Sequence, residues 1–238
     1  MFLDKGSHEI NYGQIPGLQQ PLTSYHFTKF YKDHNNLPTD DVLLQVEEEV
    51  LKNHLPLLKQ MFKRYKVENL FAVHIPHRHF EVPVGFSLVG QTISDGRCYS
   101  IRRVANNTLN CGQVCGRKFV FDNQGWFPCE FHEGSAPDLR ELDGEFFREL
   151  TTYLISHDLT STFGLEYIVP ELIILDILET NPSNDELQLA EPKSVPFNDA
   201  KTVTTSWGWP DPIYTREIRC IVFPEVGHQK ADVKPKEL

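Results

Sequence analysis

The sequence lacks the signals that direct a chain into a membrane or out of the cell. Residues 1–6 contain no basic segment followed by an apolar one, so we expect no secretory signal. No run of about 18 or more apolar residues occurs, so we expect no transmembrane helix and no membrane partner. The 5 cysteines are an odd number and accompany no export signal, which predicts reduced thiols and a cytoplasmic location.

The chain also has little positive charge. It contains 23 Lys and Arg residues against 33 Asp and Glu residues, which gives a net charge of −10 at pH 7. A negative field repels phosphate backbones, so we expect no nucleic-acid partner. The main basic cluster, at residues 59–66, falls at the end of a predicted helix, where cations interact favourably with the negative end of the helix dipole.

Several catalytic motifs are absent. There is no G-x-S-x-G turn for a serine nucleophile, no phosphate-binding glycine loop and no H-E-x-x-H zinc motif. A catalytic cysteine would have to be one of the five, and none stands in a local signature. Cys220 alternates with Ile218 and Val222, which predicts a core position.

What the sequence does contain indicates a folded domain with a large core. The chain has 238 residues, 40% of them hydrophobic, with 16 Phe and 16 Pro. Frequent prolines favour short elements and many turns. We predict a helix from Thr39 that breaks near residues 53–54 and restarts at Pro56, and a second helix from about 138 or 143 to 157. Strands are predicted at 70–74, 80–89, 99–104, 119–121, 126–131, 164–169, 172–178, 201–207 and 213–223.

The predicted fold class is α+β, a mostly antiparallel β-sheet packed by two main helices. Short, turn-rich links between successive strands favour antiparallel pairing. We divide the chain into an N-terminal arm (1–38), a single α+β domain (39–228) with an exposed loop at 181–200, and a frayed tail (229–238). His34, in the arm, is predicted to lie at the surface.

The segment from Val73 to Pro83 holds three histidines and a glutamate close together. If it is extended, His77, His79 and Glu81 share one face, with Cα atoms roughly 6.5–7 Å apart. Two imidazoles and a carboxylate are ligands used by catalytic zinc and by non-haem iron. His228 is the best remote candidate for a fourth ligand, followed by His132, and His74 could fold back as another.

The same segment has a structural interpretation. Arg78, His79 and Glu81 could form the solvated polar face of an edge strand, with no metal bound. The chain would then be a non-catalytic binding or interaction protein. In that alternative the aromatic turn containing Trp207 and Trp209 belongs to a recognition patch, although two such tryptophans could equally cap the end of a sheet.

A second candidate site is a structural zinc bound by three cysteines and one histidine. Cys111, Cys115, Cys129 and His132 have the spacing C-x3-C-x13-C-x2-H, which is compatible with such a site. Strand alternation argues against it. If residues 126–131 form a regular strand that continues to residue 132, Cys129 and His132 lie on opposite faces, and Cys129 is a core residue.

Short motifs also resemble uncharacterised proteins of filamentous fungi. The resemblance lies in His77-Arg78-His79-Phe80, in the extended run to Gly90, in the 119–131 hairpin and in the late tryptophan turn, and it covers about residues 45–228. It implies a shared domain and no function.

The sequence therefore predicts a soluble intracellular protein with a histidine-centred pocket. If the protein is an enzyme, we expect His77, His79, Glu81 and His228 to bind a divalent zinc or iron ion that acts on a small-molecule ligand. The substrate, the reaction and the oligomeric state do not follow from the sequence.

Overall fold

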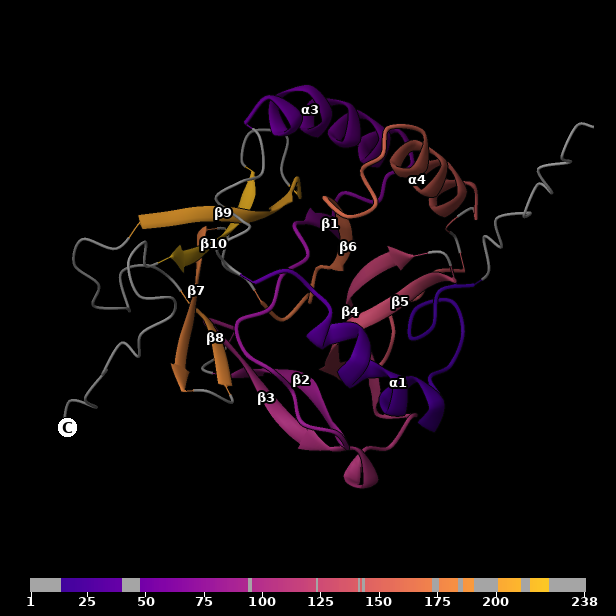
Figure 1. Ribbon diagram of the computed structural model, residues 1–238. Coiled ribbons are helices and arrows are strands. Elements are labelled where there is room, and N and C mark those ends of the chain that lie inside the picture. Colours follow the sequence, from indigo (N-terminus) through magenta and orange to yellow (C-terminus); the bar gives the residue numbers. More distant parts are fainter. Residues whose placement is uncertain are drawn as a thin grey trace, which may run out of the picture.

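The strands of this protein close on themselves into a barrel, and helices pack against its outer wall (Figure 1). The computed structural model describes residues 14–39, 48–93, 96–122, 124–140, 142, 144–172, 176–183, 186–190, 201–210 and 215–222. None of the helices in this part of the chain is long and apolar enough to span a membrane.

Neighbouring strands around the barrel are mostly antiparallel. Their order is β1 (Phe71–His74), β6 (Gly164–Tyr167), β4 (Val114–Asp122), β5 (Gly125–Glu133), β2 (Phe86–Ile93), β3 (Cys98–Ala105), β8 (Glu186–Ala190), β7 (Asp176–Ser183), β10 (Arg216–Val222) and β9 (Lys201–Gly208). The ring closes where β9 pairs with β1. Two pairs are parallel: β2 with β5, and β7 with β10.

The helices cover two separate regions of the wall. Helix α3 (Glu48–Arg64) and helix α4 (Glu145–Ser156) pack together, with Phe62 edge-on to Phe146, and Phe146 stacks on Phe71 of β1. Helix α1 (Ser24–Asn35) lies against β2 and β5, where Phe27 and Phe30 contact Phe131. A short 3-10 turn, η1 (Asn106–Thr108), follows β3.

The alternation of side chains along the strands directs charged groups into the barrel. Leu165 and Tyr167 of β6 belong to the apolar cluster under α3 and α4, so Glu166 between them faces inward. Phe131 of β5 faces α1, so Glu130 also faces inward. Both carboxylates are buried, and aliphatic and aromatic side chains fill the interior around them.

A register irregularity in β4 brings two consecutive cations into the same interior. The pairing of β4 with β5 shifts on both sides of Lys118, as in a β-bulge. Regular alternation would send Arg117 and Lys118 to opposite faces. Instead both contact the interior acid Glu130, and both are buried.

The predicted fold class is confirmed in part. The chain has mixed α and β content and mostly antiparallel pairing. The expectation of two main helices is not confirmed, because the described residues contain three α-helices and the sheet predominates. The hairpin at Phe119–Phe131 is confirmed by the pairing of β4 with β5, and the closing pair by β9 with β10.

Other expectations need correction. Helix α3 continues through Pro56 without the predicted break, and Leu58, Met61 and Phe62 on its buried face favour continuing the helix. The N-terminal arm contains α1, which places His34 in the core and not at the surface. The predicted loop at 181–200 contains the end of β7 and all of β8, which pair with each other. Residues 191–200 and 229–238, and the start of the helix predicted from Thr39, lie outside the described residues, and the domain division stays a prediction.

Candidate metal centre

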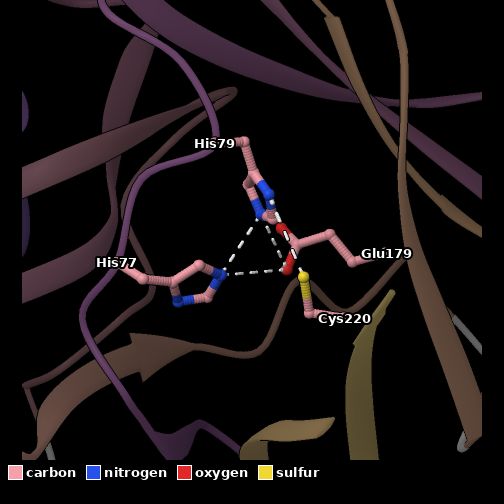
Figure 2. A group of neighbouring side chains, drawn as sticks. All are labelled: His77, His79, Glu179 and Cys220. Carbon is pink, nitrogen blue, oxygen red and sulfur yellow. Dashed lines mark hydrogen bonds and ion pairs between the residues drawn. The ribbon is translucent and has the colours of Figure 1, made fainter. Parts of the chain in front are cut away.

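Four side chains from three distant parts of the chain converge inside the barrel. His77 and His79 come from the segment between β1 and β2, Glu179 from β7 and Cys220 from β10 (Figure 2). One potential ligand atom from each residue lies within 4.8 Å of the other three. We call these residues the four-ligand group. It is the one such group of three or more residues that the described part of the chain contains.

The parallel pairing of β7 with β10 places two members of the group together. Cys220 is the register partner of Glu179, so the two residues are lateral neighbours on adjacent strands. Neighbours in register on adjacent strands project to the same face of a sheet. Both side chains are buried, and Figure 2 shows them directed toward the histidines.

Helix α1 and the turn after it hold the histidine segment in place. The side chain of Asn35 accepts from the Val82 amide at 2.8 Å and donates to the Val82 carbonyl at 2.9 Å. Arg78 donates its backbone amide to the Pro38 carbonyl at 2.8 Å and its Nε to the Leu37 carbonyl at 3.1 Å. These bonds hold the backbone at Arg78, between the two histidines, and at Val82, three residues after His79.

The three distances among His77, His79 and Glu179 are close to the edges of a tetrahedral coordination sphere. The two Nε2 atoms of His77 and His79 lie 3.2 Å apart, and Glu179 Oε2 lies 3.7 Å from the first and 3.5 Å from the second. Zinc bonds of about 2.0–2.1 Å in a tetrahedron separate two ligand atoms by roughly 3.3–3.4 Å. An ion at the centre of this triangle would therefore require only small adjustments.

The hydrogen bonds around the group leave lone pairs directed toward its centre. His77 Nδ1 lies 2.8 Å from the Ile75 carbonyl, a bond that requires the proton on Nδ1 and leaves Nε2 as an acceptor or metal ligand. Glu179 Oε2 is buried and makes no hydrogen bond of regular geometry, and its charged neighbours are His79 Nε2 at 3.5 Å and His77 Nε2 at 3.7 Å. Buried carboxylate oxygens rarely lack a partner, so this atom fits a cation that lies between it and the imidazoles.

Electrostatics favour the charged forms of these side chains. Burial lowers the pKa of His77, but its contacts with Cys220 and Glu179 outweigh burial and raise the pKa to about 9. Burial raises the pKa of Glu179, but the charges of Lys118 and His79 hold it well below its usual range. The pKa of Cys220 is also lowered, because the two histidines outweigh its burial. The fold thus stabilises a carboxylate and a thiolate beside a protonated His77, and a bound metal ion would take the place of the proton on His77 Nε2.

A small cavity of about 20 Å³ adjoins the group. A space of this size holds about one water molecule. Lys118 projects toward it, with Nζ 3.5 Å from Glu179 Oε1 and 3.9 Å from Glu130 Oε2. The cavity is lined by His34, His74, His77, Arg78, His79, Phe80, Leu88, Lys118, Cys129, Glu130, Glu179 and Leu187.

Among the predicted ligands, His77 and His79 belong to the group and Glu81 does not. The Glu81 side chain is 76% exposed and lies 3.8 Å from Arg78 on the surface. The prediction for Glu81 assumed an extended chain. Residues 77–81 instead bend along α1, so the period of two does not apply. His228 lies outside the described residues.

His74 serves a structural purpose. Its Nε2 lies 3.1 Å from the Phe119 carbonyl in the adjoining part of the barrel. Burial lowers its pKa to about 3, so the ring is neutral at physiological pH. The buried Nε2–H of His74 therefore donates to a backbone carbonyl, and not to a member of the four-ligand group.

The sequence pattern did not identify Glu179 as a possible ligand, and it placed Cys220 in the core without connecting it to the histidines. The prediction that Cys220 occupies a core position is correct, but the core at that point borders the histidines. Glu179 falls directly after the apolar run predicted at 172–178. A carboxylate two residues after the buried Ile177, on the same strand face, was the available signal.

The alternative site of three cysteines and one histidine does not form in the described part of the chain. Cys115 pairs in register with His132, but the His132 ring bonds the Tyr99 hydroxyl at 3.0 Å. Cys111, Cys115, Cys129 and His132 do not come together as a group of metal ligands in the described structure, and burial raises the pKa values of Cys115 and Cys129 to about 12.

The two tryptophans lie inside the fold. Trp207 and Trp209 are buried in the apolar cluster, where Trp209 stands edge-on to Phe62 of α3. They are therefore not available to a surface recognition patch.

Comparisons of this chain with protein-family models, with curated proteins and with solved structures find no match.

Proposed function

We propose that this protein binds one zinc ion through His77, His79, Glu179 and Cys220, and that the ion acts as a Lewis acid on a small molecule. The observation that carries the proposal is the triangle formed by two imidazole Nε2 atoms and Glu179 Oε2, with edges of 3.2, 3.5 and 3.7 Å. At its corner stands a buried carboxylate oxygen that makes no hydrogen bond of regular geometry with the described residues.

The donor set favours zinc over other divalent ions. Calcium and magnesium prefer oxygen ligands alone, whereas this group offers two nitrogens, one oxygen and one sulfur. Iron accepts two histidines and a carboxylate, and it is the runner-up. The thiolate and the near-tetrahedral spacing favour zinc.

The adjoining cavity supports a chemical role for the ion. Zinc sites that are purely structural have four protein ligands and no neighbouring space, whereas catalytic sites keep a position for water or substrate. Three members of the group line the 20 Å³ cavity, and Cys220 is not among its lining residues. A water or a small polar group on that side would be a fifth ligand beside the four protein side chains, a coordination number that catalytic zinc can reach, and the ion would polarise it or lower its pKa.

Elemental analysis of the purified protein tests the metal site. We expect about one zinc per chain in the wild type and loss of most of it in H77A/H79A, E179Q and C220S, because each variant removes a ligand. His157→Ala is the matched control, since its ring lies on α4's exposed end. The proposal fails if wild-type protein takes up no zinc, or if H77A/H79A retains it.

A second candidate function uses Cys220 as a nucleophile. Its Sγ lies 3.9 Å from His79 Nδ1, and His79 Nε2 lies 3.5 Å from Glu179 Oε2, which is the order of a cysteine–histidine–carboxylate triad. Full burial of Cys220 weighs against this function. Rapid alkylation of Cys220 in protein that takes up no zinc would favour the triad. Alkylation only after treatment with a chelator would favour the zinc site.

A further inference from the structure

We propose that the cavity beside the four-ligand group binds one oxygen of a small oxyanion, in place of the single water molecule that it can hold. This inference rests on the proposed zinc site and names the class of molecule that the ion would act on. It follows from an excess of positive charge and of hydrogen-bond donors inside the barrel once the ion is bound.

The charged side chains inside the metal-free barrel pair with one another. Arg117 bridges Glu130 and Glu166, donating through Nη1 to the first and through Nη2 at 2.7 Å to the second. Arg216 lies 3.5 Å from the same Glu166 Oε1, and Lys118 lies between Glu130 and Glu179. Three cations therefore pair with three carboxylates. His77 and His79 lie next to one of these carboxylates, Glu179.

Zinc would change this balance. Its two positive charges are neutralised by the Glu179 carboxylate and the Cys220 thiolate, its two anionic ligands. Arg117, Lys118 and Arg216 are then left with two carboxylates, Glu130 and Glu166, so one positive charge is uncompensated. An unpaired charge in a buried site is costly, and an anion that enters the site relieves it.

Unused donors indicate the same excess. Arg117 Nε and both Nε and Nη2 of Arg216 are buried and lack acceptors among the described residues. Glu166 does not supply them in this structure: its Oε1 contacts both arginines through other nitrogens, and its Oε2 accepts from Ser206 Oγ at 2.6 Å. The interior thus holds more donors than its own acceptors can satisfy.

Lys118 determines where an anion would lie. It is the one of the three cations that lines the cavity next to His77 and His79. Its nearest carboxylate oxygens are 3.5 and 3.9 Å from Nζ, longer than an ammonium–carboxylate hydrogen bond of about 2.8 Å. An oxyanion in the cavity could accept from Lys118 on one side and coordinate the ion on the other. Because the 20 Å³ cavity has room for about one water-sized group, only one oxygen of the smallest carboxylate, formate, would occupy it.

Cobalt(II) loaded in place of zinc provides an optical probe of this site. We would titrate the cobalt-loaded full-length protein with formate, and separately with formamide, at constant ionic strength. We expect formate to shift the visible cobalt bands and to saturate, while formamide, of equal size and without charge, leaves them unchanged. Lys118→Met should weaken formate binding at least ten-fold, and Lys118→Arg should largely preserve it. Lys29→Met, on a surface ion pair with Asp33, is the control.

Several results would overturn the proposal. Formate without effect on the wild type, or formamide with an equal effect, excludes an anion site. Formate affinity unchanged in K118M excludes the assigned lysine, provided circular dichroism and cobalt stoichiometry show that the variant is folded and loaded. If K118M does not fold, Lys118→Gln replaces it. Cobalt that binds without responding to formate refutes this inference alone, whereas a wild type that takes up no cobalt refutes the metal site as well.

Discussion

At the scale of single residues, Arg117 is a buried charge held by partners on several sides. Its side chain is fully buried, it pairs with Glu130 and Glu166, and its guanidinium lies 4.8 Å from the centre of the Tyr99 ring. Burial acts against its charge, but the two carboxylates outweigh burial and raise its pKa further. The two acids could not remain ionised at low energetic cost without it.

Removal of Arg117 should therefore destabilise the fold strongly. We expect Arg117→Met to lower the free energy of unfolding by about 3–5 kcal/mol, because two buried carboxylates lose their main partner. Arg148→Met removes an exposed ion pair with Glu145 and should change the free energy of unfolding by no more than about 1 kcal/mol. Urea denaturation measures both. Equal effects of the two variants would contradict the buried network.

At the scale of elements, close approach between strands depends on Gly164 in β6. A Cβ at this position would lie 2.4 Å from His74 Nε2 on β1 and 2.4 Å from the Phe119 carbonyl on β4. The carbonyl belongs to the backbone, so it cannot move away without displacing the strand. Glycine is therefore required where β6 passes between its two neighbours.

Gly164→Ala should destabilise the protein by about 1–3 kcal/mol or prevent folding, because the added methyl group overpacks the strand junction. Gly144→Ala is a matched control, since nothing lies within 4 Å of the corresponding Cβ, and it should alter stability by less than about 1 kcal/mol. Thermal unfolding followed by circular dichroism compares the two. A G164A protein as stable as G144A would contradict the close packing of these strands.

The contact between α1 and the histidine segment gives a second prediction at this scale. Asn35→Ala removes both hydrogen bonds to Val82 and loosens the backbone next to His79. We expect zinc affinity to fall about ten-fold although every ligand remains, as when outer-shell partners of a metal site are lost. Competition with a chromophoric chelator measures it, with Asn110→Ala, in an exposed turn, as control. An unchanged affinity would show that α1 does not position the ligands.

The sequence predicted local elements better than it predicted the site. The Phe119–Phe131 hairpin and the helix ending near residue 157 follow from turn chemistry and from apolar spacing, which act over a few residues. Glu179 and Cys220 meet only because β7 and β10 pair in parallel, a contact that no local pattern determines. Glu81 was misplaced because hydrogen bonds from α1, and not strand pairing, shape residues 77–81.

At the scale of the whole molecule, buried neutral histidines and a paired carboxylate make stability depend on acidity. Burial lowers the pKa of His34 to about 4 and that of His74 to about 3, from a usual value of 6.5. Burial opposes ionisation of Glu166, but Arg117 and Arg216 outweigh it and lower its pKa to about 2. All three groups are less protonated in the folded chain than in the unfolded chain at moderately acidic pH.

Proton binding determines whether the stability of the fold rises or falls with pH. A group with a depressed folded pKa contributes stability above its unfolded pKa and loses it as pH falls toward the folded value. The histidines therefore reduce stability from pH 6.5 downward to about 3–4, and Glu166 from about 4.5 to 2. We expect the urea midpoint of chelator-treated protein to fall steadily below pH 6. His34→Gln should flatten the upper part of that decline, and an unchanged slope would contradict the assignment of His34 as neutral.

Closure of the barrel also bears on how the chain folds. The seam joins β1 to β9, and the ligand pair His79 and Cys220 is separated by 141 positions in sequence. Closing a flexible loop of that length costs on the order of 4 kcal/mol in chain entropy before any contact compensates it. Such non-local topologies fold slowly. A nascent chain would thus hold two histidines for most of its synthesis without the glutamate and the cysteine, and the four-ligand group would be complete only in the last step of assembly.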